Sequence, residues 1–139
     1  MIPGVVRMTV DLRHHGDGVL QDMEARLHAA IDRIARDGKV EIAIEKVQDL
    51  AAIEFDPDCI AAVRAGAEAL GLAHRDIISG AGHDAVHLSK VTPTSMIFVP
   101  CKDGLSHNEA ESATIEHCAA GAQVLLEAAL ALDAKLGGR

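Results

Sequence analysis

The sequence contains almost no aromatic residues. Of its 139 residues only Phe55 and Phe98 are aromatic, and tryptophan and tyrosine are absent. Because 49% of the residues are nonetheless hydrophobic, the core must be built from alanine, valine, isoleucine and leucine. A chain of this length buries roughly two thirds of its unfolded surface. We therefore expect a globular protein of the α/β (α+β) class, with aliphatic helices packed on a sheet.

The sequence also lacks any run of basic residues. Its 13 lysines and arginines are outnumbered by 21 acidic residues, which gives a formal net charge of −8. Binding to nucleic-acid phosphates needs a concentrated basic face. We therefore expect no nucleic-acid partner.

No apolar stretch reaches the roughly 18 residues of a membrane span, and no basic segment precedes an apolar core near the N-terminus. We expect no membrane partner and a cytoplasmic protein. The three cysteines, Cys59, Cys101 and Cys118, are far apart and form no C-x-x-C pair. They indicate thiols in a reducing compartment and predict neither a disulfide framework nor a cysteine zinc site.

Residues 1–50 alternate between strand-like and helix-like patterns. Residues 4–13 and 39–47 alternate apolar with polar side chains, which predicts two half-buried strands. Between them, residues 19–36 carry an apolar stripe typical of a helix that stops at Gly38. The stripe consists of Val19, Leu20, Met23, Leu27, Ile31 and Ile34. The order predicts a βαβ unit.

Residues 51–139 have a different character, with apolar elements separated by loops that contain glycine and histidine. Asp56 and Pro57 predict the N-cap and the first residue of a helix. The continuous apolar run at 94–99 predicts a fully buried strand. A last helix is expected from about 112 to 136, with one long packing stripe. The stripe consists of Ile115, Cys118, Ala122, Leu125, Ala129, Leu132 and Leu136.

The loop "SGAGHDA" (79–85) is the first candidate for binding or catalysis. Gly80 and Gly82 allow the backbone to approach a ligand, and His83 places an imidazole beside the carboxylate of Asp84. Alternatively, the glycines only form a turn and Asp84 caps the next helix. The residues leave both interpretations open.

The loop "GLSHNEAE" (104–111) is the second candidate. Ser106 and Glu109 fit a capping box, with His107 at the start of the helix. His107 is then either an exposed residue of the cap or a side chain presented to a cleft. One histidine is not a zinc site, because zinc takes three or four ligands and no H-E-x-x-H motif is present.

The stretch "DLRHH" (11–15) is the third candidate. Arg13 lies on the polar face of the predicted strand and can bind a carboxylate through two parallel hydrogen bonds. The alternative is a solvated charge at the end of a strand. Adjacent side chains on a strand point apart, so we do not expect His14 and His15 to share a metal ion.

Four stretches, taken in order with the alanine-rich last helix, resemble the C-terminal part of a known enzyme family. They are "IPGVVRMTVDLRH", "EFDPD", "SGAGHDA" and "MIFVPCKDGLSHNEAE". The family is that of the zinc-dependent amidohydrolases that hydrolyse N-carbamoyl-L-amino acids, allantoate and β-ureido acids. The resemblance covers nearly the whole chain, and "SGAGHDA" followed by "SHNEAE" is its most specific part.

The resemblance implies a partial two-domain metallohydrolase. Residues 1–50 would be the second half of a ferredoxin-like lid domain, which also builds a homodimer, and residues 51–139 the C-terminal part of an α/β catalytic domain. His107 matches the family's last metal ligand, and Arg13 matches the arginine that holds the substrate carboxylate. Gly82 and His83 match the loop that lines the pocket.

The family's other functional residues have no counterpart in this chain. Its H-x-D ligands, bridging aspartate, Glu–Glu pair and lid histidine are absent, so no catalytic residue is assigned here. The family implies two zinc ions, and manganese, cobalt or nickel suit the same ligands. We expect that the chain alone binds no metal and is inactive, and that it is a reading frame beginning inside a longer gene or a cut piece.

Two alternatives remain. One is a non-catalytic interaction or assembly module that uses the edge of the predicted βαβ unit. The other is a small independent enzyme that uses His83, Asp84 and His107 without further subunits, although no nucleophile is identified for it.

Overall fold

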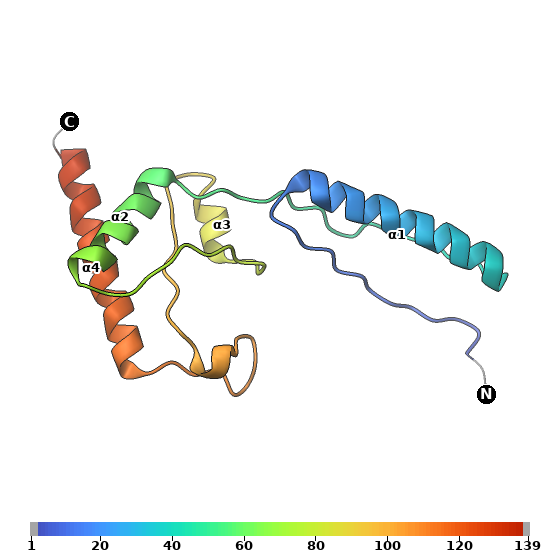
Figure 1. Ribbon diagram of the computed structural model, residues 1–139. Helices are drawn as coiled ribbons and strands as arrows, with labels where there is room; N and C mark the ends of the chain where they lie inside the picture. Colours follow the sequence, from blue (N-terminus) through green and yellow to red (C-terminus); the bar gives the residue numbers. More distant parts are fainter. Residues whose placement is uncertain (1–2, 138–139) are drawn as a thin grey trace. The chain divides into compact units, whose positions relative to one another are not determined.

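The computed structural model describes residues 3–137, and its regular elements are all helical (Figure 1). They are α1 (Asp17–Gly38), α2 (Pro57–Ala69), α3 (Asp84–Leu88), the 3₁₀ turn η1 (Lys102–Gly104) and α4 (Ile115–Gly137). The chain divides into two compact units. The first comprises the described residues up to Ile53 together with Ile78–Gly80, and the second comprises Glu54–Ile77 with the described residues from Ala81 onward.

Helix α1 forms where the apolar stripe predicts it, so this prediction is confirmed. Its acidic first residue, Asp17, favours the positive end of the helix dipole. The helix continues through Gly38, and the left-handed residue that ends it is Lys39, with φ 50°. The half-buried stripe is narrower than predicted, because Val19 and Ile34 are exposed.

The strands predicted at 4–13, 39–47 and 94–99 do not form in the described structure, where residues 3–137 contain helices and no strand, so the predicted βαβ unit is not observed there. An extended segment becomes a strand only when a neighbour completes its ladder of hydrogen bonds. Among the described residues no such ladder joins the first two segments. Their apolar side chains consequently stay exposed, as at Met8, which is 81% accessible.

The segment 94–99 is half-buried at most positions, where the sequence predicts full burial. One backbone hydrogen bond, from Asp56 N–H to Thr94 O at 3.0 Å, ties its first residue to the start of α2. The segment is therefore part of the second unit, and it enters no sheet among the described residues.

Helix α2 begins as the sequence predicts. The carboxylate of Asp56 accepts a hydrogen bond from the Cys59 backbone N–H at 2.9 Å, and Pro57 follows in the first turn. This bond is the main reason that the pKa of Asp56 lies below its ordinary value. Gly71, with φ +64°, takes the left-handed conformation that ends many helices. The predictions that Asp56 is the N-cap and that Pro57 is the first residue of the helix are therefore confirmed.

Helices α2 and α4 pack on each other through small residues. The most buried side chains of the described core are Cys59, Ala67, Val124 and Ala128. At Gly66, a Cβ would lie 3.2 Å from the Cβ of Glu127 and 3.3 Å from the carbonyl oxygen of Val124. Glycine at this position therefore lets the two helices approach closely.

The packing face of α4 differs from the predicted stripe. Ile115 is 84% and Leu125 60% accessible, whereas Val124 is only 5% accessible. Because an alanine-rich helix is apolar on most sides, small residues can face α2 while larger leucines face outward. The side chain of Leu136 lies outside the described part of the structure.

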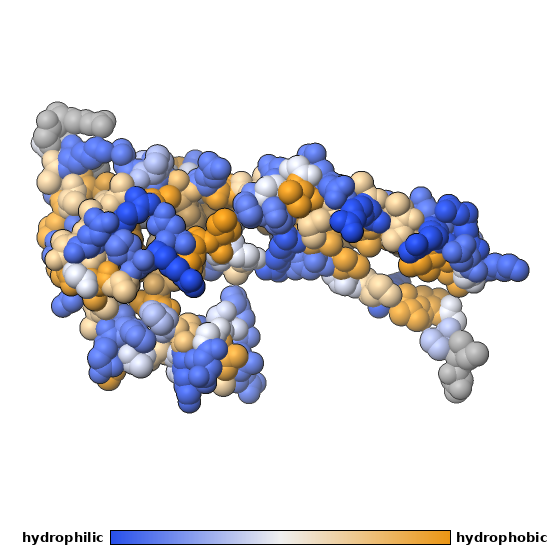
Figure 2. Space-filling view, in the orientation of Figure 1, coloured by the Kyte–Doolittle hydropathy of each residue, from blue (hydrophilic) through white to orange (hydrophobic). Residues whose placement is uncertain are grey.

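Helix α4 is also the single described helix long and apolar enough to cross a membrane, judged by length and composition. Gln123 and Glu127 interrupt the apolar residues of this helix, so its sequence contains no continuous apolar run of span length. A core helix of a soluble protein meets the same criteria, and one face of α4 packs on α2. Figure 2 shows apolar residues at the surface of each unit, so exposed apolar surface is not peculiar to α4.

Truncating Val124 tests which face of α4 is packed. Val124→Ala removes two buried methyl groups and should lower the free energy of unfolding by about 1–3 kcal/mol. Leu125→Ala removes a mostly exposed side chain and should change it by no more than about 0.5 kcal/mol. Urea denaturation of both variants measures the difference, and a larger loss for Leu125→Ala would restore the predicted stripe.

Candidate functional site

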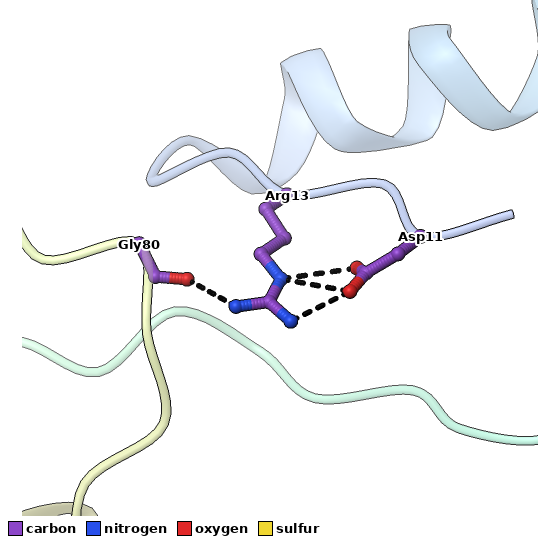
Figure 3. Close-up of polar contacts among 3 residues, drawn as sticks. All are labelled: Asp11, Arg13 and Gly80. Atoms are coloured by element: carbon purple, nitrogen blue, oxygen red, sulfur yellow. Dashed lines mark hydrogen bonds and ion pairs between the residues drawn. The ribbon is translucent and has the colours of Figure 1, made fainter. Parts of the chain in front are cut away.

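Arg13 lies on the extended segment before α1 and is held by two partners (Figure 3). Its Nε donates to both carboxylate oxygens of Asp11, at 3.1 and 3.0 Å, and its Nη2 donates to Asp11 Oδ2 at 2.6 Å. Its Nη1 donates to the carbonyl oxygen of Gly80 at 2.8 Å. Both charged side chains are more than half exposed. The guanidinium is thus both fixed and accessible.

The pairing of Asp11 with Arg13 follows from local geometry. Side chains two residues apart on an extended segment point to the same side. The hydrogen bond from Arg13 is the main cause that lowers the pKa of Asp11 below its ordinary value of 3.8, and the same bond raises the pKa of Arg13. At neutral pH the two groups are therefore an ion pair. Asp11 lies on the same polar face as Arg13 in the alternating pattern of residues 4–13, and no sequence motif indicates its role.

His14 and His15 do not point apart as expected. Their rings stack with centroids 4.4 Å apart and planes at 23°. The reason is that the chain turns here, with the Gly16 backbone N–H donating to His14 Nδ1 at 2.9 Å. The backbone at His14 and His15 is therefore not the extended end of a strand.

The loop 79–85 leads into the short helix α3. His83 occupies the N-cap position with extended backbone angles and makes no side-chain cap. Its half-buried ring meets Phe98 edge-on, with centroids 5.5 Å apart. Asp84 is the first residue of α3 and not its cap, so the capping alternative is wrong. Gly82 is exposed, and a Cβ there would meet nothing within 4 Å.

His107 lies in a closed loop before α4 and not at a helix start. Its φ of 54° is left-handed, which is uncommon for residues other than glycine. Its backbone N–H donates to Glu111 Oε2 at 2.8 Å, and its side chain is exposed. The loop is closed at its base by a hydrogen bond from Lys102 N–H to Ser112 O at 2.7 Å. The acceptor on Glu111 thus supports the unusual backbone conformation of His107.

The capping box predicted at Ser106 and Glu109 is wrong. Helix α4 begins at Ile115, and Thr114 precedes it with its Oγ1 accepting a hydrogen bond from His117 N–H at 3.2 Å. The residues Ser106 and Glu109 match the capping-box motif S-x-x-E, but the backbone at these positions forms a loop and not a helix start.

The described residues do not by themselves fit the metal ions that the resemblance implies. Between residues 3 and 137 no group of three or more histidine, cysteine, aspartate or glutamate side chains is arranged to hold a metal. A metal site in proteins needs several such ligands around one point. His107 therefore offers one ligand without a set.

The predicted site residues fall into different units. Arg13 and Gly80 belong to the first, and Gly82, His83 and His107 belong to the second. Within the first unit, Arg13 donates a hydrogen bond to the carbonyl oxygen of Gly80. The assignment of Gly82, His83 and His107 to a common pocket stays a prediction.

Comparison with known proteins relates nearly the whole chain to one family. Residues 2–131 match the Peptidase family M20/M25/M40. The chain is 45% identical over 130 residues to an N-carbamoyl-L-amino-acid amidohydrolase of Rhizobium meliloti, covering 94% of this chain and 31% of that protein. It is 33% identical over 125 residues to the allantoate amidohydrolase of Escherichia coli strain K12, covering 90% of this chain and 30% of that protein.

A solved structure shows a similar fold. An amidase of the hydantoinase/carbamoylase family from Burkholderia multivorans superposes with a TM-score of 0.77 and 54% identity, over 83% of this chain and 28% of that chain. The fold described above therefore matches part of a larger amidase fold. The chain spans about a third of the length of the curated relatives it matches.

Removing the acceptor on Glu111 should loosen the loop around His107. In Glu111→Ala the His107 amide loses its partner, so its hydrogen exchange should become roughly tenfold faster. Glu111→Gln keeps an oxygen acceptor and serves as the control with a smaller effect. Amide exchange followed by NMR measures both, and an unchanged His107 amide in Glu111→Ala would contradict this account of the loop.

The ion pair between Asp11 and Arg13 should weaken as the pH falls. A carboxylate whose pKa is lowered by its partner keeps the interaction above its ordinary pKa and loses it as the pH falls through the lowered value. The Asp11 carboxyl should therefore titrate below 3.8, and Arg13→Gln should move its midpoint back toward 3.8. A ¹³C NMR titration measures this, with Arg26→Gln as the control that leaves Asp11 unchanged.

Proposed function

The chain belongs to the Peptidase family M20/M25/M40, and on that basis we propose that it is part of an amidohydrolase acting on carbamoyl or ureido C–N bonds. The substrate class would be N-carbamoyl-L-amino acids or related ureido acids, as the names of the relatives suggest. The reaction is hydrolysis, in which water adds to the ureido carbonyl and the bond to the amino acid nitrogen breaks.

The accessible, anchored guanidinium of Arg13 is the observation that supports this proposal most. Substrates of this class carry a free carboxylate, and arginine binds carboxylates through two parallel hydrogen bonds. A guanidinium has five N–H donors. The contacts with Asp11 and Gly80 occupy Nε–H, one donor on Nη2 and one on Nη1. One donor on each of Nη1 and Nη2 therefore remains for a substrate.

His107 is the proposed metal ligand of this segment. Its accessible position on a closed loop supports the assignment. Zinc is the proposed ion, with manganese, cobalt or nickel as alternatives. Because the described residues hold no complete ligand set, the remaining ligands and the general base would come from parts of the enzyme that this chain does not contain.

The domain assignment is also part of the proposal. Residues 1–50 would form half of a ferredoxin-like lid and residues 51–139 part of the catalytic domain, with Gly82 and His83 lining the pocket. The complete enzyme would be a cytoplasmic homodimer. Exposed apolar side chains at Val5, Met8 and Val47 support a role for the first segment in pairing with further structure.

The same exposed apolar residues favour a second candidate, a non-catalytic assembly module. In that case the segment would pair with another chain without contributing to a reaction. A chimera discriminates between the two candidates. This chain would replace the matching segment of the Rhizobium meliloti relative, with which it shares 45% identity. A folded, metal-loaded chimera without turnover would contradict the proposed enzyme and favour the module.

Arg13→Lys in this chimera tests the proposed carboxylate contact. Lysine keeps the charge but loses the bidentate geometry, so kcat/KM for N-carbamoyl-L-alanine should fall by roughly ten- to hundredfold. Ethylurea, which lacks the carboxylate, should be affected little. Arg26→Lys, on the exposed face of α1, is the control. Equal losses for both substrates would show that Arg13 is structural, and the isolated chain should show no turnover at all.

A further inference from the structure

Arg13 is oriented before any ligand is present. Asp11 accepts from the edge of the guanidinium formed by Nε and Nη2, and the Gly80 carbonyl accepts from Nη1. Figure 3 shows these two partners on opposite sides of the guanidinium. A free arginine side chain samples many rotamers, and ordering it on binding lowers affinity. An arginine held on both sides avoids much of that loss.

We propose that Asp11 is a positioning residue for Arg13, fixing the guanidinium so that the remaining donors on Nη1 and Nη2 receive the substrate carboxylate. The inference rests on the proposed function, in which Arg13 binds that carboxylate. Asp11 itself would not touch the substrate. Its role is to hold the arginine in the orientation that binds.

The donor geometry supports this division of roles. A carboxylate that accepts from Nε and Nη2 uses the donor of Nη2 that faces Nε, and the other donor of Nη2 stays available. Gly80 takes one donor of Nη1 from the side away from Asp11. The unused donors therefore belong to the two terminal nitrogens, which together can bind a second carboxylate.

The two anchors of Arg13 differ in charge. Asp11 is charged, so it also neutralises the guanidinium locally, whereas Gly80 contributes a neutral backbone carbonyl. The carbonyl leaves the net charge of the pair unchanged. It also links Arg13 to Gly80, a residue 67 positions further along the chain in the same unit.

A competing interpretation assigns Asp11 the opposite effect. Asp11 would then occupy the site that the substrate carboxylate needs and would have to be displaced on binding. The two interpretations predict opposite changes in KM when Asp11 is removed. A positioning residue raises KM on removal, and a competing carboxylate lowers it.

The first measurement uses the chain itself and does not depend on any reaction. Solvent exchange of the Arg13 Nε–H, followed by ¹⁵N NMR, should become roughly fivefold faster in Asp11→Ala and should return toward the original rate in Asp11→Glu. Asp22→Ala is the matched control, because it removes a carboxylate that pairs with Arg26 at 3.8 Å in the same unit. Unchanged exchange in Asp11→Ala would overturn the proposal.

The second measurement uses the chimera with N-carbamoyl-L-alanine. Asp11→Ala should raise KM roughly five- to tenfold with kcat nearly unchanged, and Asp11→Glu should restore much of the loss. In the Arg13→Lys background, Asp11→Ala should add little, because the two residues act as one unit.

The outcomes separate this inference from the function on which it rests. A higher KM in Arg13→Lys combined with an unchanged or lower KM in Asp11→Ala overturns the positioning role alone. An unchanged KM in Arg13→Lys overturns the carboxylate contact of Arg13, and the positioning role with it. A higher KM in both single variants, without further increase in the double variant, is the result expected.

Discussion

Backbone hydrogen bonding determines how much structure this chain builds from its own residues. A helix satisfies its N–H and C=O groups internally, and α1, α2 and α4 are well formed. An extended segment needs a neighbour for the same purpose. The segments 4–13 and 39–47 have the strand pattern and no partner strand in the described structure, so most of their apolar side chains remain exposed to solvent. Arg13, on which the proposed substrate contact depends, lies on one of these segments.

The second unit depends instead on the close packing of α2 and α4. Small residues at Gly66, Ala67 and Ala128 bring the helices together, and Gly121 leaves no room for a side chain against Val99. A Cβ at Gly121 would lie 2.6 Å from Val99 Cγ1, so the end of the segment 94–99 lies directly against α4. The loop that carries His107 starts just after this contact. Packing of small residues in the core thus supports the place where a metal ligand is proposed.

The sequence predicted local features well and non-local ones poorly. The position of α1 and the start of α2 at Asp56 follow from periodicity and capping, which act within a few residues. The predicted strands do not form in the described structure, because strand pairing depends on residues far away in the sequence or on other parts of a larger fold. The packing face of α4 was predicted wrongly, because alanine and leucine occur on all sides of this helix and periodicity does not distinguish them. At the candidate site, the polar face of Arg13 was predictable, whereas its anchoring by Asp11 and Gly80 and the left-handed backbone of His107 depend on contacts that no sequence pattern displays.

We expect the three extended segments, 4–13, 39–47 and 94–99, to become strands once the rest of an M20-type enzyme surrounds them. Hydrogen–deuterium exchange of residues 4–13, 39–47 and 94–99, compared between the isolated chain and the chimera, tests this most directly. The account predicts fast exchange in the isolated chain and at least roughly tenfold slower exchange in the chimera, while peptides from α2 and α4 are protected in both. Equally fast exchange of the three segments in a folded, active chimera would contradict it.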